Sequence, residues 1–162
     1  MIEIQSMYPD TKPELYALLQ QQLLALLEGE SHSIPNLANT AALLAGALQE
    51  INWVGFYLMT DGYLLLGPFQ GKPACIRISL GSGVCGTAAA LDITQRIVDV
   101  HLFPSHIACD CDSNSEIVIP IHAAGKVIGV LDIDSPVCNR FDQVDQEGLE
   151  AMVRILETAC TW

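Results

Sequence analysis

Residues 115–134 read SEIVIPIHAAGKVIGVLDID, two apolar runs on either side of Ala123-Ala124-Gly125. β-Branched residues fill both runs, and a glycine in a short loop supplies the left-handed backbone that a tight turn needs. The stretch therefore predicts an antiparallel hairpin with a three-residue loop. The expected pairs across it are His122 with Lys126, Val118 with Val130, and Glu116 with Asp132.

The two faces of this hairpin differ in character, because side chains alternate between the faces of a strand. One face is expected in the core and carries Ile117, Ile119, Ile121, Val127, Leu131 and Ile133. The other face carries Val118, Ile128 and Val130 near its middle, and Glu116, Asp132 and Asp134 together at the end far from the turn.

The three carboxylates have two interpretations. A solvated sheet face is the usual one, since Asp and Glu are seldom buried unpaired. Like charges that face each other destabilise a sheet, however, so carboxylates on an otherwise apolar hairpin favour a functional role. Crowded carboxylates raise one another's proton affinity, so one can act as an acid while another stays anionic and binds an ammonium group. The pattern does not assign these roles to particular residues.

The rest of the sequence predicts helices at both ends around short strands. The expected helices are 11–27 (Leu15, Leu18, Leu19, Leu23, Leu26 and Leu27 inward), 37–50, 83–92 and 141–162 (Val144, Leu149, Met152, Ile155 and Leu156 inward). The expected strands are 51–59 and 63–69 around Asp61-Gly62, then 74–81, 95–100, 115–121 and 126–134. Helical and alternating periodicities in this order predict one α+β domain over residues 1–162.

Composition excludes several partners. The 162 residues include 19 acidic and 7 basic side chains, a net charge of −12. Nucleic acid and anionic membranes bind cationic surfaces, so neither is expected as a partner. The first residues show no basic segment followed by an apolar run, and no stretch of about 18 apolar residues follows, so we expect a cytoplasmic protein.

An aromatic strand provides a candidate binding wall. In the segment 52–57, NWVGFY, Trp53, Gly55 and Tyr57 share one face, and Val54 and Phe56 share the other. Two aromatic rings flanking a glycine can bracket a small ligand, although packing in the core explains them equally well.

The six cysteines call for a chemical explanation, because no export signal indicates a disulfide-rich secreted protein. They lie at 75, 85, 109, 111, 138 and 160, a spacing that fits no zinc site, so no bound metal is expected. Cys138 and Cys160 are expected to be buried structural thiols. Cys109 lies in a polar loop where a thiol is reachable. Cys85 opens the helix start GSGVCGTAA, whose backbone N–H groups favour a thiolate or another anion.

Seven runs of sequence, in order along nearly the whole chain, resemble the free methionine-R-sulfoxide reductases, which are built on a GAF domain. The runs are NWVGFYL, GPFQGKPACIRI, GSGVCGTAA, DVHLFPSHIACD, SEIVIP, VIGVLDIDSP and FDQVDQEGLE. The resemblance implies a central, mostly antiparallel six-stranded sheet flanked by N- and C-terminal helices, and commonly a homodimer.

The resemblance also implies a site and a reaction. It makes Cys109 the nucleophile, Cys75 and Cys85 the thiols that act in resolution, Glu116, Asp132 and Asp134 the substrate-binding acids, and Trp53 and Tyr57 the pocket wall. The substrate is free methionine-(R)-sulfoxide, and Cys109 becomes a sulfenic acid and then part of a disulfide. Thioredoxin, with NADPH and thioredoxin reductase, recycles the enzyme in its defence against oxidative stress, without a bound cofactor. Which of Cys75 and Cys85 is the main resolving thiol stays open.

Two alternatives remain at this point. A GAF module that senses a small molecule shares the fold, and a cysteine redox sensor would form a disulfide without turnover. Cys111 and Asp112 stand where relatives tend to have small residues, so Cys111 is a bystander, traps the Cys109 sulfenic acid in an off-pathway bond, or assists in resolution.

Overall fold

The computed structural model describes residues 8–104 and 112–162. One six-stranded sheet in the order β3-β2-β1-β6-β5-β4 forms its centre, and all its neighbouring strands are antiparallel. The strands are β1 (Trp53–Thr60), β2 (Tyr63–Gly71), β3 (Arg77–Ser79), β4 (Gln95–Ile97), β5 (Ser115–Ala123) and β6 (Lys126–Ser135). The helices are α1 (Lys12–Leu27), α2 (Ser33–Ala47), α3 (Gly83–Leu91), the 3-10 helix η1 (Val100–Leu102) and α4 (Gln143–Ala159). The expected α+β architecture with helices at both ends is confirmed.

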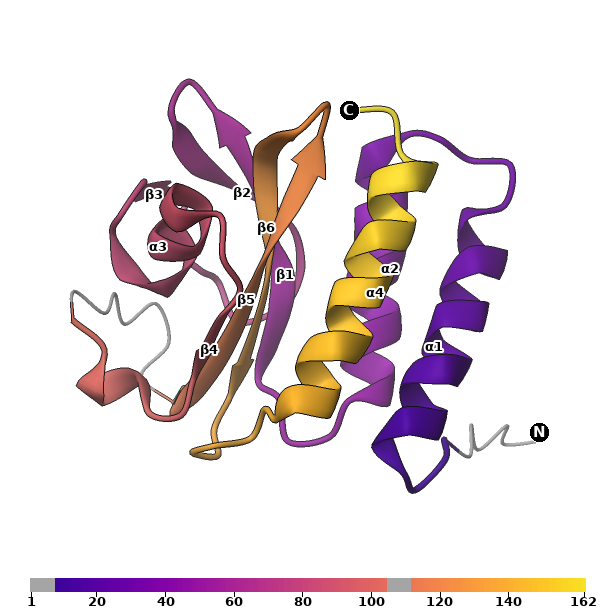
Figure 1. Ribbon diagram of the computed structural model, residues 1–162, viewed down its shortest axis with the longest axis horizontal. Coiled ribbons are helices and arrows are strands. Elements are labelled where there is room, and N and C mark those ends of the chain that lie inside the picture. Colours follow the sequence, from indigo (N-terminus) through magenta and orange to yellow (C-terminus); the bar gives the residue numbers. More distant parts are fainter. Residues whose placement is uncertain (1–7, 105–111) are drawn as a thin grey trace.

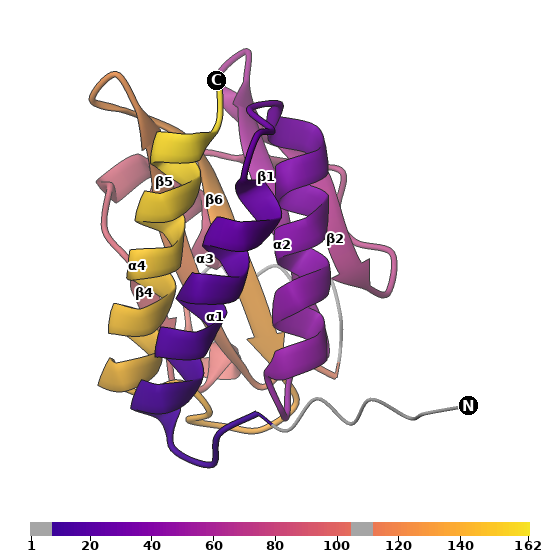
Figure 2. The same cartoon turned by 90° about the vertical axis from the view of Figure 1, so that its right-hand side faces the viewer.

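The sheet separates two unequal layers. Helices α1, α2 and α4 cover one face, whereas α3 lies on the other face, near the edge strand β3 (Figure 1). A quarter turn brings the three long helices in front of the sheet, which is seen behind them (Figure 2). No helix in the described part of the chain is long and apolar enough to cross a membrane.

The larger core lies between the sheet and the three long helices. Its buried side chains come from alternate positions of β1, β5 and β6 and from one stripe of each helix, among them Leu19, Leu23, Leu44, Phe56, Ile117, Ile133 and Leu149. At the crossing of α1 and α4 the ring of Tyr16 packs on Gly148, and the Tyr16 hydroxyl donates to Asp145 Oδ1 at 2.8 Å. Asp145 is almost fully buried and also accepts from Lys12 Nζ at 2.5 Å, so its charge is compensated.

The crossing of α1 and α4 yields a stability prediction. A Cβ at position 148 would lie 2.2 Å from Tyr16 Cγ, so we expect Gly148→Ala to lower the free energy of unfolding by about 1–3 kcal/mol. Gly46 in α2 is the matched control, because a Cβ there meets no atom within 4 Å. Gly46→Ala is expected to stabilise by up to about 1 kcal/mol through its better helix propensity. Urea unfolding of both variants measures the difference, and an unchanged stability for Gly148→Ala would contradict the packing.

The register of the β5–β6 hairpin corrects the sequence prediction. The turn has two residues, Ala124 and Gly125, both at positive φ, so Ala123 pairs with Lys126. A three-residue loop was expected because Gly125 supplies the left-handed backbone that such a loop needs. The positive φ of Ala124 is uncommon for alanine, and it allows the shorter turn. A bulge follows between Ile121 and His122, with Ile128 as the extra residue. The observed pairs are His122 with Val127, Val118 with Asp132, and Glu116 with Asp134.

Turn and bulge together shift the pairing by two residues, which restores the expected faces beyond the bulge. Glu116, Asp132 and Asp134 therefore do share a face. Between turn and bulge the shift is only one residue, so the two neighbours Val127 and Ile128 exchange faces. Val127 packs with the smaller core under α3, and Ile128 packs with the larger one, the reverse of the prediction.

Three further predictions were wrong. Leu26 of α1 is 44% exposed, and Tyr16 is buried on that helix instead. The expected strand 95–100 ends at Ile97, because the chain turns into η1, where the Asp99 carboxylate accepts from His101 N. Cys138 is exposed rather than buried, whereas Cys160 is buried as expected.

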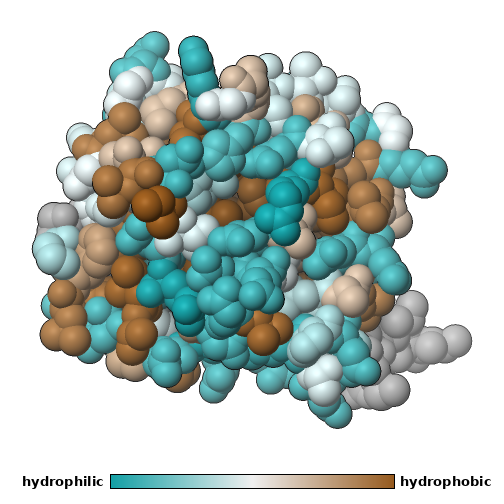
Figure 3. Space-filling model, viewed as in Figure 1, coloured by the Kyte–Doolittle hydropathy of each residue, from teal (hydrophilic) through white to brown (hydrophobic). Residues whose placement is uncertain are grey.

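The surface is mixed in character. Figure 3 shows a mainly hydrophilic centre on the face of Figure 1. Arg96 of β4 donates to Gln146 of α4 at 3.2 Å. Hydrophobic side chains gather towards the left of this view, over α3 and η1. The exposed apolar residues of that region include Leu91, Ile93 and Leu102.

Candidate active site

A pocket of about 530 Å³, including its open mouth, lies on the α3 side of the sheet. Its walls come from β1, from the ends of β5 and β6, from the start of α3, and from the segment between β2 and β3. The lining residues are Trp53, Tyr57, Pro73, Ala74, Ile78, Ser82, Gly83, Val84, Cys85, Ser113, Glu116, Asp132 and Asp134. The structure thus brings together both aromatic residues and all three carboxylates that the sequence singled out.

The aromatic wall is fixed by hydrogen bonds and by a glycine. Trp53 Nε1 donates to Lys72 O at 3.1 Å, and the Tyr57 hydroxyl donates to Cys75 O at 3.0 Å. The two rings are 5.9 Å apart, and a Cβ on Gly55 between them would lie 2.6 Å from Trp53 Cη2. Glycine is therefore required for Trp53 to lie flat beside Tyr57, and the segment from Lys72 to Cys75 is held against the pocket.

The carboxylates form the pocket's polar floor. Glu116 on β5 and Asp132 on β6 are each only 6% exposed, and Asp134 is half-buried. Asp132 Oδ1 is fully buried and has no hydrogen-bond partner among the described residues. No Lys, Arg or His side chain lines the described pocket. A buried, unpartnered carboxylate oxygen is costly in the empty protein, so it is suited to a cationic ligand.

Burial and mutual repulsion shift the pKa values of these groups. Burial, followed by the charges of Asp132 and Asp134, raises the pKa of Glu116 well above 4.5. Burial raises the pKa of Asp132 to about 6, although hydrogen bonds with Cys85 and Glu116 oppose this shift. Tyr57 has a raised pKa for the same reasons, so its hydroxyl stays protonated. Glu116 is therefore the candidate to hold a proton in this pocket, and Asp132 is the candidate to stay anionic.

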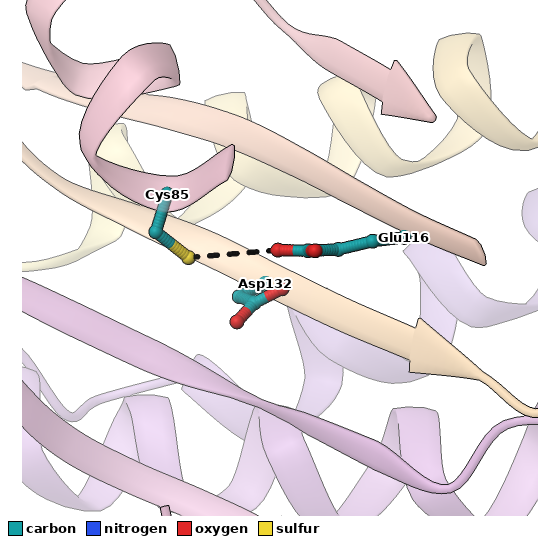
Figure 4. Close-up of side chains that lie close together, drawn as sticks. All are labelled: Cys85, Glu116 and Asp132. Atoms are coloured by element: carbon teal, nitrogen blue, oxygen red, sulfur yellow. Dashed lines mark hydrogen bonds between the residues drawn. The ribbon is translucent and has the colours of Figure 1, made fainter. Parts of the chain in front are cut away.

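The Cys85 side chain points towards the carboxylates of Glu116 and Asp132 (Figure 4). Its thiol donates to Glu116 Oε1 with Sγ and oxygen 3.9 Å apart. Burial, and then the charges of Asp132 and Glu116, raise the pKa of this thiol well above 9.0. A thiolate at Cys85 is therefore disfavoured, because burial and two carboxylates outweigh the backbone N–H groups at the α3 start.

The other two thiols of the predicted site differ in what the structure describes. Cys75 follows the segment that bonds to Trp53, is half-buried, and is disulfide-bonded. Cys85, Cys138 and Cys160 are free thiols. Cys109 and Cys111 lie outside the described residues. Ser113, four residues after Cys109 in the sequence, lines the pocket.

Sequence reasoning missed several contributors to the pocket. Asn52 Nδ2 donates to Ser113 Oγ at 3.0 Å and so joins the start of β1 to the segment that precedes β5. Ser82, Gly83 and Val84 line the pocket at the α3 start. The GSGV motif was a usable signal for this helix start, whereas the contact between Asn52 and Ser113 spans 61 positions and left no local signal.

Comparison with known proteins agrees with the fold and the pocket. The family model of the GAF domain matches residues 33–160. The chain is therefore a GAF-domain protein. It is 56% identical over 146 residues to a free methionine-R-sulfoxide reductase of Escherichia coli, covering 90% of this chain and 88% of that protein. The chain belongs to the free methionine-R-sulfoxide reductases, a family of enzymes.

Two solved structures support this assignment. The reduced form of a protein named fRMsr from Staphylococcus aureus is 55% identical, with a TM-score of 0.87, and the match covers 89% of this chain and 94% of that one. The free methionine-R-sulfoxide reductase of Neisseria meningitidis, solved in complex with its substrate, is 41% identical with a TM-score of 0.92. That match covers 98% of this chain and 95% of the other.

Proposed function

We propose that this protein reduces free L-methionine-(R)-sulfoxide to methionine. The observation that carries the proposal is a single pocket in which two aromatic rings face three carboxylates, one with a buried oxygen that has no partner among the described residues. Similar reductases from Escherichia coli and Neisseria meningitidis support the activity, and the Neisseria protein was solved with its substrate. The R preference rests on this family membership alone.

The pocket offers a partner for each part of the substrate. The α-ammonium group pairs with the buried Asp132 carboxylate, whose Oδ1 otherwise lacks a partner among the described residues. The α-carboxylate lies at the start of α3, where Ser82 and Gly83 line the pocket and free backbone N–H groups favour an anion. The methyl sulfoxide group packs on Trp53 and Tyr57. A peptide-bound methionine sulfoxide lacks both terminal charges, so the pocket favours the free amino acid.

The reaction needs a proton at the sulfoxide oxygen. Glu116, whose pKa is raised by burial and by neighbouring carboxylates, donates this proton while the Cys109 thiolate attacks the sulfur. The oxygen passes to Cys109, which becomes a sulfenic acid, and methionine leaves. The sulfoxide is thereby reduced by two electrons and the thiol is oxidised by two electrons, so no metal or organic cofactor takes part.

Recycling completes the cycle. Cys75 attacks the sulfenic acid, water leaves, and a disulfide forms between Cys75 and Cys109. Cys75 suits this role better than Cys85, because Cys75 is disulfide-bonded and half-buried, whereas Cys85 is a buried free thiol with a raised pKa. A thioredoxin-type dithiol, with NADPH and thioredoxin reductase, then reduces the disulfide. We place this cycle in the cytoplasm, where such dithiols keep thiols reduced, as part of the response to oxidative stress.

A comparison of substrates tests the proposal. A thioredoxin-coupled NADPH assay measures activity with free methionine-(R)-sulfoxide, its S epimer and a peptide-bound sulfoxide. We expect activity with the first substrate only. Activity with none of them would favour a ligand-sensing GAF module or a redox sensor, and equal activity with the peptide would contradict the terminal-charge contacts.

The ammonium contact yields a separate prediction. Asp132→Asn keeps the shape of the side chain but removes its charge, so we expect KM for free methionine sulfoxide to rise at least about 30-fold, or about 2 kcal/mol. Asp92→Asn is the matched control, since Asp92 caps α3 outside the pocket. Steady-state kinetics of both variants measures the effect, and a KM unchanged by Asp132→Asn would move the ammonium site elsewhere.

The homodimer implied by family resemblance is a further part of the proposal. We expect light scattering after size-exclusion chromatography to give twice the chain mass of 17.5 kDa. A monomer at micromolar concentration would overturn this part and leave the reductase proposal unchanged, because that proposal assigns no role to a residue of a second chain.

A further inference from the structure

One thiol and two carboxylates meet at the floor of the pocket. The Cys85 thiol comes from α3, the Glu116 carboxylate from β5 and the Asp132 carboxylate from β6, and one donor atom of each lies within 4.8 Å of the others (Figure 4). All three side chains are at least nine-tenths buried, and all line the pocket. Spacing along the sequence gave no zinc signal, because these residues are 31 and 16 positions apart and only the fold joins them.

A second observation indicates a missing cationic ligand. Asp132 is 6% exposed, and its Oδ1 has no hydrogen-bond partner among the described residues. Cys85 donates to Glu116 over 3.9 Å, a weak contact with the other carboxyl group. A cation at this point would satisfy the orphaned oxygen and compensate the negative charge of Asp132.

The spacing of the groups fits a tetrahedral cation. Zinc bonds of about 2.3 Å to sulfur and about 2.0 Å to oxygen place the two donor atoms about 3.5 Å apart in a tetrahedral site. The Cys85 sulfur and Glu116 Oε1 are 3.9 Å apart, so a contraction of a few tenths of an ångström brings them into place. Mg²⁺ and Ca²⁺ require six or more oxygen ligands, which a site with one thiol among three ligands does not offer.

We propose that Cys85, Glu116 and Asp132 bind a thiophilic divalent cation of the zinc class, and that this cation competes with the amino-acid substrate. Three protein ligands leave the fourth position to a water molecule, as in open zinc sites. The Cys85 thiol loses its proton when the metal binds, because the thiolate is the ligand. The cation occupies the place of the substrate ammonium group beside Asp132 and engages Glu116, so substrate and metal exclude each other. The pocket would thus contain an inhibitory metal site. Its competition with substrate rests on the proposed reductase function.

The direct test uses Co²⁺ as a coloured substitute for Zn²⁺. A full-length protein with Cys75→Ser, Cys109→Ser and Cys111→Ser keeps the three proposed ligands and removes the two thiols of the proposed disulfide together with Cys111. We expect one equivalent of Co²⁺ to produce a thiolate charge-transfer absorption band, and one equivalent of Zn²⁺ to abolish it. Adding Cys85→Ser should remove the band, and adding Asp132→Asn should weaken Co²⁺ binding at least about 10-fold.

Two matched thiols serve as controls. Cys160→Ser and Cys138→Ser, a buried and an exposed free cysteine outside the pocket, should leave the band and the affinity unchanged. The proposal would be overturned if the absorption band survived Cys85→Ser. It would also be overturned if more than one Co²⁺ bound per chain and Asp132→Asn left the Co²⁺ affinity unchanged. Circular dichroism of each variant confirms that it is folded.

Competition tests the second half of the proposal without any turnover. Free methionine sulfoxide should lower the apparent affinity of the triple-Ser protein for Co²⁺ in proportion to its concentration. Co²⁺ binding that methionine sulfoxide leaves unchanged would overturn the competition. Failure of the reductase proposal is distinguishable, because the charge-transfer band reports the metal site even in a protein that reduces no sulfoxide.

Discussion

Cys75→Ser is expected to stop thioredoxin-supported turnover while leaving one stoichiometric reduction of methionine sulfoxide per protein. The first reduction needs only the Cys109 thiol and a proton donor, whereas the second needs the sulfenic acid to be resolved into a disulfide. Cys109→Ser should abolish both. Quantifying methionine after a single mixing, and NADPH consumption in the coupled assay, separates the two steps.

Cys85→Ser is the informative comparison for this prediction. Its thiol is buried and free, so we expect the ratio of multiple to single turnover to stay as in the wild type, even if the contact with Glu116 alters the rate. The free and exposed Cys138 provides a neutral control. Unimpaired cycling of Cys75→Ser would transfer the resolving role to Cys85, and mass spectrometry showing a bridge between Cys109 and Cys111 would assign it to Cys111.

The fold was predictable where the signal was local and periodic. The apolar alternation of β5 and β6 placed Ile117, Leu131 and Ile133 in the core, and the structure confirms all three. The strand alternation of β1 likewise placed Trp53 and Tyr57 on the face opposite Phe56. Such patterns depend only on the period of a strand, so they survive errors in the pairing.

The register was not predictable, and its error shows why the carboxylate cluster nevertheless was. An alanine at positive φ in the turn and a bulge at Ile128 have no clear sequence signal. Their combined shift is two residues, so Glu116, Asp132 and Asp134 kept a common face. Had only one of the two occurred, the acids of β5 and β6 would lie on opposite faces of the sheet.

The composition of the pocket beyond the hairpin was harder to derive. Cys85 and Glu116 interact across 31 positions, and only the packing of α3 on the sheet brings them together. The protonation of Glu116 depends on burial, which a sequence does not state. For these reasons the sequence named the acids but left the proton donor open, whereas the structure favours Glu116.

Glu116→Gln is expected to lower kcat/KM for methionine sulfoxide by about 10²–10⁴-fold, the usual contribution of a general acid. Glutamine retains the size and hydrogen-bonding groups of a protonated glutamic acid but has no proton to give to the sulfoxide oxygen. The loss should therefore appear mainly in kcat. Glu147→Gln, on the exposed face of α4, changes one carboxylate outside the pocket and should leave both constants unchanged.

The same substitution should stabilise the folded protein at high pH. The pKa of Glu116 is raised in the folded state, so its contribution to stability is fully present below about 4.5, its value when unfolded, and is lost as the pH rises through the folded pKa. Asp132 behaves in the same way: its pKa is raised from 3.8 to about 6 by folding, so its contribution to stability is also lost as the pH rises through this range. The amide introduced by Glu116→Gln does not titrate, so the variant should gain stability relative to the wild type as the pH increases from about 4 to about 8.

Activity and stability measured together distinguish a proton donor from a packing residue. Thermal unfolding at about pH 4 and about pH 8 gives the stability difference, and steady-state kinetics gives the catalytic loss. If Glu116 is a donor held protonated by its surroundings, Glu116→Gln should be catalytically weak. It should also be more stable than the wild type at the higher pH and similar in stability at the lower pH. A variant destabilised equally at both pH values would show that Glu116 acts through packing, and a variant with full activity would transfer the donor role to Asp134. The loss of activity and the gain of stability at high pH have one cause. The buried carboxylates raise the pKa of Glu116 and so supply the proton for the reaction, and the same carboxylates destabilise the folded protein when Glu116 ionises.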